Sequence, residues 1–367
     1  MKIDQPTLFI KEEQVRANIQ KMVNKAHKSK VTFRPHFKTH QAAIVGEWFK
    51  EYGVDKITVS SVDMAEYFAN NGWSDITIAF PFNILQIDRV NALAKKITLN
   101  LLVESETVIS FLAEKINSHV NLWIKVDTGY HRTGIAWNNE ALLSKLIRKI
   151  KAADNLAFSG LLLHSGNTYK TKSTEEIEEI YEDSYLKLKN IQERLLLQGF
   201  RLVKLSIGDT PTCSVIDDFT GMDEIRPGNF VFYDLMQLKL GSCTEKEIAI
   251  AMACPIVAFH PERDELLIYG GGIHFSKEYL QTSEAENSYG AIVLPEKNNW
   301  GPIQKKMNLI SLSQEHGIVS VPKDIQKQFK VGDILYILPV HSCMTANLMK
   351  RYYTLDGKEI RMMPLFQ

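Results

Sequence analysis

A lysine lies within a run of basic and aromatic residues near the N-terminus, Arg34-Pro-His-Phe-Lys-Thr-His40. A lysine amine is nucleophilic once it loses its proton, and burial beside other cations favours that loss. The basic neighbours here are Arg34, His36 and His40. A buried Lys38 could therefore form a Schiff base with an aldehyde. Surface lysines are far more common than reactive ones, so a surface lysine is the alternative interpretation.

A second polar cluster, Ser206-Ile-Gly-Asp-Thr-Pro-Thr212, could bind a phosphate group. Backbone N–H groups of a glycine-containing loop and threonine hydroxyls supply the converging donors that phosphate needs. Gly-Asp-x-Pro is also a common turn composition, and an ordinary turn is the alternative. A third cluster begins at His164 and ends at Tyr169. Both side chains can donate or accept protons, although His164 could equally be a structural histidine.

A histidine and a cysteine separated by one residue lie near the C-terminus, in Val340-His-Ser-Cys-Met-Thr-Ala-Asn347. Alternate residues of a strand point to the same face, so His341 and Cys343 could bind one metal ion if this segment is extended. Imidazole and thiolate together suit zinc best. Cysteine is also commonly a small buried apolar residue, which is the alternative for Cys343.

The elements that position these clusters alternate between short apolar runs and longer amphipathic stretches. This pattern predicts parallel strands with helical crossovers, and most of the runs are continuously apolar, as strands covered on both faces are. The eight predicted strands are Val31–Lys38, Lys56–Ser60, Asp75–Phe80, Thr98–Val103, Asn121–Asp127, Ala157–His164, Arg201–Ile207 and Glu224–Tyr233. Eight such units favour a closed (β/α)8 barrel with its active site at the carboxyl ends of the strands.

The polar clusters follow these strands, as an active site at that end of a barrel requires. The lysine cluster follows the first predicted strand, the cluster at His164 the sixth, and the cluster at Gly208 the seventh. The clearest predicted helix follows Ser173, where apolar residues recur with a period near 3.6 and Gly199 offers a stop. We therefore expect the candidate residues of the first half of the chain to share one barrel mouth.

After about Gly241 the pattern changes to short strands interrupted by Gly, Pro and Asn. The strands expected there are Ile248–Phe259, Glu265–Tyr269, Gln314–Val319 and Ile334–Leu338. This indicates a second, mostly β domain at residues 241–367, after a barrel at residues 11–240. The run Thr7–Ile10 within the N-terminal strand segment 1–10 could pair with the barrel, and we assign that segment to the β domain.

Composition excludes several classes of protein. The 367 residues include 45% hydrophobic and 23% charged residues, as in ordinary globular proteins. Forty-three basic residues balance 43 acidic ones, so no global field attracts nucleic acid or an anionic membrane, and we expect a small-molecule partner. The four cysteines show no disulfide framework, and neither a secretory signal nor a membrane-spanning run is present. A cytoplasmic location is expected.

The lysine cluster resembles the motif of the fold-type III pyridoxal-phosphate enzymes, in the branch of D-threonine aldolases and D-serine dehydratases (alanine racemase-like). The resemblance runs from about Thr7 to Asn347, and it implies that Lys38 forms the Schiff base with the cofactor. Members of this branch usually have a lysine where this chain has Gln41, which is beside the chemistry and not within it. His36 is expected on the cofactor side of the same cluster.

The resemblance also assigns roles to the other clusters. It implies phosphate contacts from Gly208 and Thr210, and places His164 and Tyr169 at the ring or phosphate of the cofactor. Arg132 is a candidate for a contact with the cofactor ring, or with a residue that itself contacts the cofactor. It lies in a segment similar to the Lys-x-Asp-x-Gly-x-x-Arg-x-Gly run of the branch. Tyr233 resembles another cofactor-side position, although it could equally be a packing residue.

The metal pair carries the functional prediction. Enzymes of this branch bind a divalent metal here, zinc or else manganese, and its dehydratases tend to have His-x-Cys where its aldolases have His-x-Asp. His341 and Cys343 therefore favour elimination of water from a D-3-hydroxy amino acid. The alternatives are retro-aldol cleavage to glycine and an aldehyde, racemisation, and a non-catalytic regulatory protein that binds pyridoxal phosphate. The resemblance further implies a head-to-tail homodimer.

Overall fold

The computed structural model describes residues 2–281, 286–297 and 299–364. The chain divides into two compact units, of which one comprises Gln20–Gly228 and the other the residues up to Ile19 together with Asn229–Pro364. Each unit is described on its own. The domain limits expected from the sequence, 11–240 and 241–367, stay a prediction, and residues 1 and 365–367 lie outside the described part.

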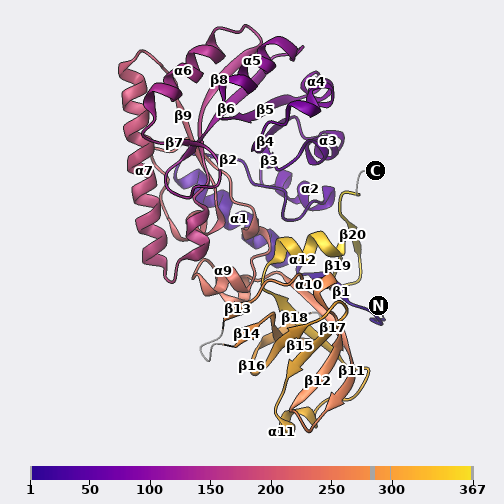
Figure 1. Ribbon diagram of the computed structural model, residues 1–367. Coiled ribbons are helices and arrows are strands. Elements are labelled where there is room, and N and C mark those ends of the chain that lie inside the picture. Colours follow the sequence, from indigo (N-terminus) through magenta and orange to yellow (C-terminus); the bar gives the residue numbers. More distant parts are fainter. Residues whose placement is uncertain (1, 282–285, 298, 365–367) are drawn as a thin grey trace. The chain divides into compact units, whose positions relative to one another are not determined.

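A parallel barrel forms the first unit (Figure 1). Its strands are β2 (Thr32–Phe33), β3 (Ile57–Val59), β4 (Asp75–Pro81), β5 (Thr98–Val103), β6 (Val120–Asp127), β8 (Leu156–Leu163), β9 (Lys204–Ile207) and β10 (Glu224–Ile225). They pair in the order β2-β10-β9-β8-β6-β5-β4-β3, all in parallel. A bridge between His36 and Thr58 joins the two ends of this order. The predicted (β/α)8 barrel is confirmed.

Apolar side chains explain why these strands form a closed sheet. Leu102, Trp123 and Leu162 come from three neighbouring strands and form one buried cluster. Because helices cover the outside and side chains fill the inside, a strand of such a barrel is buried on both faces. A short additional strand, β7 (Ile135–Ala136), pairs with β6 outside the main order.

Helices surround the barrel (Figure 1). They are α1 (Glu12–Lys28), α2 (Ala43–Glu51), α3 (Val62–Asn70), α4 (Ile87–Ala94), α5 (Glu106–Lys115), α6 (Glu140–Lys151), α7 (Thr174–Leu197) and α8 (Thr210–Val215). The predicted start of α7 is confirmed, because the Ser173 hydroxyl accepts a bond from the Glu176 N–H. Gly199, at a φ of 86°, follows its end.

Two of the barrel strands that the sequence predicts are reduced to two residues each. Pro35 lacks an N–H and follows β2 by two residues, so the predicted strand Val31–Lys38 narrows to two residues and one isolated bridge. The predicted strand Glu224–Tyr233 is likewise reduced to β10, because Pro227 and Gly228 interrupt it. A 3₁₀ turn, η3 (Asn229–Val231), follows in the other unit.

The second unit is mainly antiparallel sheet. Its strands are β1 (Thr7–Ile10), β11 (Ile250–His260), β12 (Glu265–Tyr269), β13 (Leu280–Gln281), β14 (Asn287–Ser288), β15 (Gly290–Glu296), β16 (Asn299–Leu312), β17 (His316–Ser320), β18 (Ile334–Pro339), β19 (Arg351–Thr354) and β20 (Glu359–Arg361). β11 pairs with both β12 and β18, so β12, β17, β16, β15, β18 and β11 form a closed ring. β1 pairs with β11 and β19, not with a barrel strand.

Four short helices accompany this sheet: α9 (Leu235–Lys239), α10 (Gly272–Phe275), α11 (Lys323–Gln326) and α12 (Ser342–Met349). α12 follows β18 directly and carries the histidine and cysteine singled out above. None of the helices in the described ranges combines the length and the apolar character that crossing a bilayer demands.

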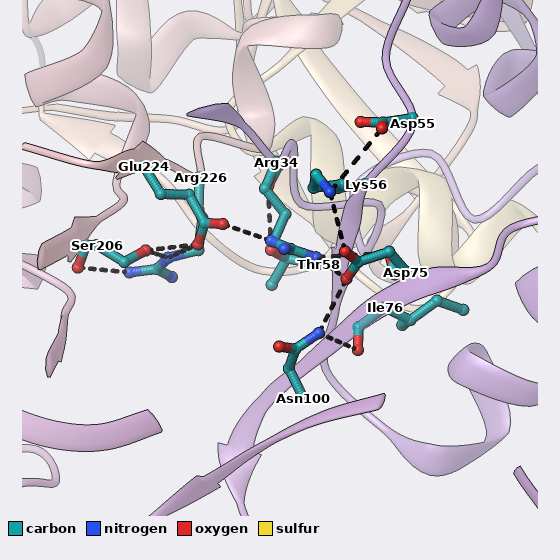
Figure 2. A network of polar contacts seen from close by, with 10 residues as sticks. All are labelled: Arg34, Asp55, Lys56, Thr58, Asp75, Ile76, Asn100, Ser206, Glu224 and Arg226. Atoms are coloured by element: carbon teal, nitrogen blue, oxygen red, sulfur yellow. Dashed lines mark hydrogen bonds and ion pairs between the residues drawn. The ribbon is translucent and has the colours of Figure 1, made fainter. Parts of the chain in front are cut away.

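A buried ionic network ties the barrel strands together (Figure 2). The Arg34 guanidinium donates to Glu224 at 2.5 Å and to Asp75 at 2.6 Å, which links the end of β2 to β10 and β4. Glu224 also accepts from the Ser206 hydroxyl on β9, at 2.7 Å, and Asp75 from Asn100 on β5, at 2.9 Å. Burial opposes charge on Arg34, but the two carboxylates outweigh it and raise the pKa of Arg34.

Replacing Arg34 should destabilise the barrel strongly. Arg34→Met leaves the buried Glu224 carboxylate without its main cation, and removal of one partner of a buried pair costs about 3–5 kcal/mol. Arg89 is the matched control, since it also bridges two carboxylates but is 39% exposed. Arg89→Met should cost about 1 kcal/mol or less. Urea unfolding of both variants measures the difference, and equal losses would contradict a special role for the buried network.

Candidate active site

The turn that carries Lys38 is held by its backbone. The Phe37 N–H donates to the Thr58 carbonyl at 2.8 Å, and the Lys38 N–H donates to His36 Nδ1 at 3.3 Å. The Gln41 amide donates to the Lys38 carbonyl at 3.0 Å. The Lys38 side chain itself is exposed, contrary to the buried lysine expected from the sequence. Its place on a turn beyond β2, outside the filled interior of the barrel, explains this difference.

Arg34 does not act as the free cationic neighbour that the sequence suggested. Its charge is balanced inside the barrel by Glu224 and Asp75. The turn is anchored instead by Phe37, which is fully buried and lies 4.9 Å from Phe49 and 5.0 Å from Trp73 between ring centroids. A buried aromatic side chain beside an exposed amine gives the turn one fixed face and one accessible face.

Two neutral histidines lie near the Lys38 charge. Burial lowers the pKa of His36 well below its usual value, and the positive charge of Lys38 adds to this. Because His36 Nδ1 accepts the Lys38 N–H, the proton of the neutral ring is on Nε2. Burial likewise lowers the pKa of His164 well below its usual value. Its Nδ1 donates to the Gly208 carbonyl at 2.6 Å, which leaves Nε2 as an acceptor.

The loop after β9 packs closely against Arg226 and leads into the short helix α8. A Cβ at Gly208 would lie 2.7 Å from the Arg226 Cβ, so only glycine permits this close packing. Asp209 caps α8 by accepting the Thr212 N–H at 2.8 Å, and burial raises the pKa of Asp209 to about 6. The Thr210 N–H donates to the Tyr169 hydroxyl at 3.2 Å. The structure thus brings Gly208, Thr210, His164 and Tyr169 together.

Two buried cations at the same end of the barrel were missed by sequence reasoning. The pKa of Lys125 is lowered to about 7, first by burial and then by the charges of Arg226 and Arg132. Arg226 is also buried, and it donates to the Ser206 hydroxyl and the Leu163 carbonyl, both at 2.6 Å. The available signal for Lys125 was a charged residue inside a strand that is otherwise continuously apolar.

Arg132 lies on the loop after β6 and is exposed, with its guanidinium carbon 5.3 Å from the centre of the Tyr130 ring. Asp127 organises this loop by accepting the N–H groups of Gly129, Tyr130 and His131. The charge of Arg132 acts on both Lys125 and His164, which places it with the other candidates of the barrel.

This donor set fits a phosphorylated aldehyde such as pyridoxal phosphate. The cations Lys38, Lys125, Arg132 and Arg226 act electrostatically on His36 or His164, and both histidines stay neutral. The buried hydroxyl of Ser165 lacks a hydrogen-bond partner within the described residues. An excess of positive charge with a spare hydroxyl donor favours a dianionic phosphate, and the accessible Lys38 amine provides the group that an aldehyde requires.

Tyr233 is not at the end of a strand, contrary to the sequence prediction. It follows η3, belongs to the second unit, and its N–H donates to the Asn229 carbonyl at 2.8 Å. Its side chain is fully buried and its φ is 50°, a left-handed conformation that is uncommon for a bulky residue. Pro227 and Gly228 end the strand before this position, which is why the extended conformation is lost.

Cys343 is helical and His341 is the extended residue just before the helix, so the two do not lie on one strand as the sequence suggested. β18 ends at Pro339, His341 is the N-cap of α12, and Cys343 is in its first turn. The two side chains still interact: burial opposes charge on His341, but its hydrogen bonds with Cys343 and Glu278 outweigh this and raise the pKa of His341 to about 11. Cys343 also accepts from the Asn229 amide at 3.6 Å.

The pair offers an imidazole and a thiol to one metal ion, the donor set that suits zinc. Over the described ranges, no group of three or more His, Cys, Asp or Glu side chains is arranged to hold a metal. Two protein ligands would leave other coordination positions to water or substrate, as catalytic sites require.

Comparisons with known proteins match the first part of the chain to one family model and the later part to another. Residues 10–235 match the family model described as alanine racemase, N-terminal domain, and residues 249–355 match the one described as putative serine dehydratase domain. A D-serine dehydratase from Dictyostelium discoideum is 28% identical, covering 97% of this chain and 94% of that protein. A D-threo-3-hydroxyaspartate dehydratase from Delftia sp. is 26% identical, covering 97% and 95%.

Solved structures share the fold. The Delftia enzyme superposes with a TM-score of 0.91 at 24% identity, covering 99% of this chain and 98% of that one. A metal-free cysteine-to-alanine mutant of a D-threo-3-hydroxyaspartate dehydratase gives 0.92 at 24% identity, covering 99% and 98%. D-threonine aldolase from Filomicrobium marinum gives 0.83 at 17% identity, covering 98% and 95%.

The neutral histidines predict a loss of stability in acid. Burial lowers the pKa of His40 to about 3, against about 6.5 in an unfolded chain, so below pH 6.5 the unfolded state binds a proton that the folded state does not. This one group should cost about 2 kcal/mol between pH 6.5 and 4.5. His40→Gln should flatten the pH dependence of the unfolding free energy by that amount, and His27→Gln on the exposed face of α1 is the control. Parallel curves for wild type and His40→Gln would be inconsistent with a buried neutral ring.

Proposed function

Because the chain belongs to the family defined by the alanine racemase N-terminal domain, we propose that it is a pyridoxal-phosphate- and metal-dependent lyase that removes water from a D-3-hydroxy amino acid. The single observation that carries this proposal is the accessible amine of Lys38, held at the end of β2 by a backbone that three hydrogen bonds define. The expected family, the dependence of that family on pyridoxal phosphate, and the lyase class are confirmed by the comparisons.

The residues that would hold the cofactor come from the barrel. Lys38 would bind its aldehyde, Gly208 and Thr210 with Tyr169 would bind its phosphate, and His36, His164 and Arg132 would border its ring. We keep Tyr233 as a cofactor-side residue, because a bulky side chain held at a φ of 50° indicates a functional constraint. When bound, pyridoxal phosphate supplies an electron sink for the substrate's α-carbon.

The side chains of this chain then account for the proton transfers. Lys38, which would hold the cofactor's aldehyde, would also serve as the base that takes the proton from the substrate's α-carbon. The neutral His164, with Nε2 as an acceptor, orients the substrate without adding positive charge near the Lys38 amine. With D-serine, loss of the β-hydroxyl as water and subsequent hydrolysis give pyruvate and ammonia.

His341 and Cys343 would hold the divalent metal, for which we propose zinc, with manganese as the alternative. Such an ion supplies a Lewis acid for the departing hydroxyl. A soft thiolate at position 343 favours zinc over the harder metals that carboxylates select. Cys343 is also the feature that favours elimination over the aldolase reaction, on the pattern of the family branch.

Retro-aldol cleavage is the second candidate, and the D-threonine aldolase fold favours its consideration. It uses the same lysine and metal but breaks the bond between the α- and β-carbons. Racemisation needs a second base opposite Lys38. A regulatory protein that only binds the cofactor has no use for the His341 and Cys343 pair. Racemisation and a regulatory role are therefore weaker candidates, each for its own reason.

Assembly and location belong to the same proposal. On the pattern of the family branch we expect a head-to-tail homodimer that acts on small-molecule D-amino acids. No disulfide joins any of the four cysteines in the described part of the chain, which suits a reducing cytoplasm.

Product analysis with D-threonine separates the two lyase reactions. Elimination of water gives 2-oxobutanoate and ammonia, which we expect, whereas retro-aldol cleavage gives glycine and acetaldehyde. Chromatography of the products from D-serine and D-threonine, with added cofactor and zinc, measures the ratio directly. Lys38→Ala should abolish turnover, and Lys95→Ala, on the outer side of the barrel after α4, is the matched lysine control. Glycine as the dominant product would assign the chain to the aldolase reaction instead.

A further inference from the structure

A carboxylate in the second unit forms a hydrogen bond with one nitrogen of the His341 ring. Glu278 Oε2 lies 2.6 Å from His341 Nδ1, and the two residues are separated by 63 positions in the chain. An imidazole has two ring nitrogens, and a partner on one of them determines which nitrogen is left to bind a metal. With Nδ1 engaged by Glu278, the nitrogen that His341 can offer is Nε2.

The backbone that leads to Glu278 is strained. Ser276 ends α10 with a φ of 73° and a ψ of 177°, a region that is essentially reserved for glycine. Holding another residue there costs about 1–3 kcal/mol, and such strain persists only where the surrounding structure enforces it. The Ser276 hydroxyl also accepts the Glu278 N–H at 3.4 Å. The strained residue therefore belongs to the same local turn as the carboxylate.

The same turn is attached to the helix that carries the metal pair. The Thr345 hydroxyl of α12 donates to the Phe275 carbonyl, the last residue of α10, at 3.0 Å, and Thr345 is fully buried. Glu278 and His341 are thus held by elements that are bonded to each other. An ordinary surface ion pair would contribute about 0–1 kcal/mol and would not repay a strained backbone.

We propose that Glu278 is the positioning residue that fixes the His341 ring with Nε2 directed to the metal, and that the turn at Ser276 exists to place this carboxylate. The inference rests on the proposed function, because it assumes that His341 and Cys343 are metal ligands. Carboxylate partners of metal-binding histidines orient the ring and raise its basicity, and their removal typically weakens metal binding about 10–100-fold.

Zinc affinity, measured by chelator competition on the full-length protein, tests this assignment without reference to turnover. Glu278→Ala should weaken zinc binding about 10–100-fold. Glu278→Gln has the same shape and keeps an acceptor oxygen without the charge, so it should show a smaller loss. This second variant also decides the question if the alanine variant folds poorly. Lys277→Ala, the exposed neighbour on the same turn, is the matched control and should bind zinc as the wild type does.

Cobalt substitution supplies a spectroscopic check, since cobalt bound to Cys343 gives a thiolate absorption band that a change in the His341 ring should shift. Wild-type zinc affinity and an unshifted band in both Glu278 variants would overturn the proposal. Cys343→Ala separates this failure from failure of the proposed function. If Cys343→Ala loses zinc while the Glu278 variants keep it, only the role of Glu278 is wrong. If Cys343→Ala binds zinc as the wild type does, the proposed metal site and the proposed role of Glu278 are both wrong.

Discussion

Closure of the barrel depends on one buried arginine, Arg34, which directly follows the short strand β2. β2 contributes only two paired residues, Thr32 and Phe33, and the side chain of Arg34 directly after it bonds to carboxylates on β10 and β4. Without that bridge, the short strand would be held mainly by its few backbone bonds. The turn that presents Lys38 begins at the next residues, so the position of the reactive amine follows from the closure of the sheet.

The chemistry at the barrel mouth follows from how charge is distributed there. Cations from the ends of several strands surround two histidines that stay neutral, and the buried acid at the same place, Asp209, has a raised pKa. An environment with excess positive charge and few competing anions binds a phosphate well. The same end of the barrel presents the accessible side chain of Lys38.

Sequence patterns predicted the barrel because its strands are continuous apolar runs, and each candidate cluster was found at a strand end. They failed where local residues compete with the pattern. Pro227 and Gly228 end β10 early, and a helix begins between His341 and Cys343 although the preceding strand pattern suggested an extended pair. Glu278 could not be predicted, since its partner lies 63 residues away and only the tertiary fold brings the two together.

Trapping of the lysine tests the central claim most directly. Purified protein loaded with pyridoxal phosphate is reduced with borohydride, digested, and mapped by mass spectrometry. A Schiff base on the amine presented by the β2 turn predicts a single pyridoxyl group, on Lys38. A map in which Lys38 is unmodified, with the label absent or on another lysine, would contradict the account of the barrel mouth.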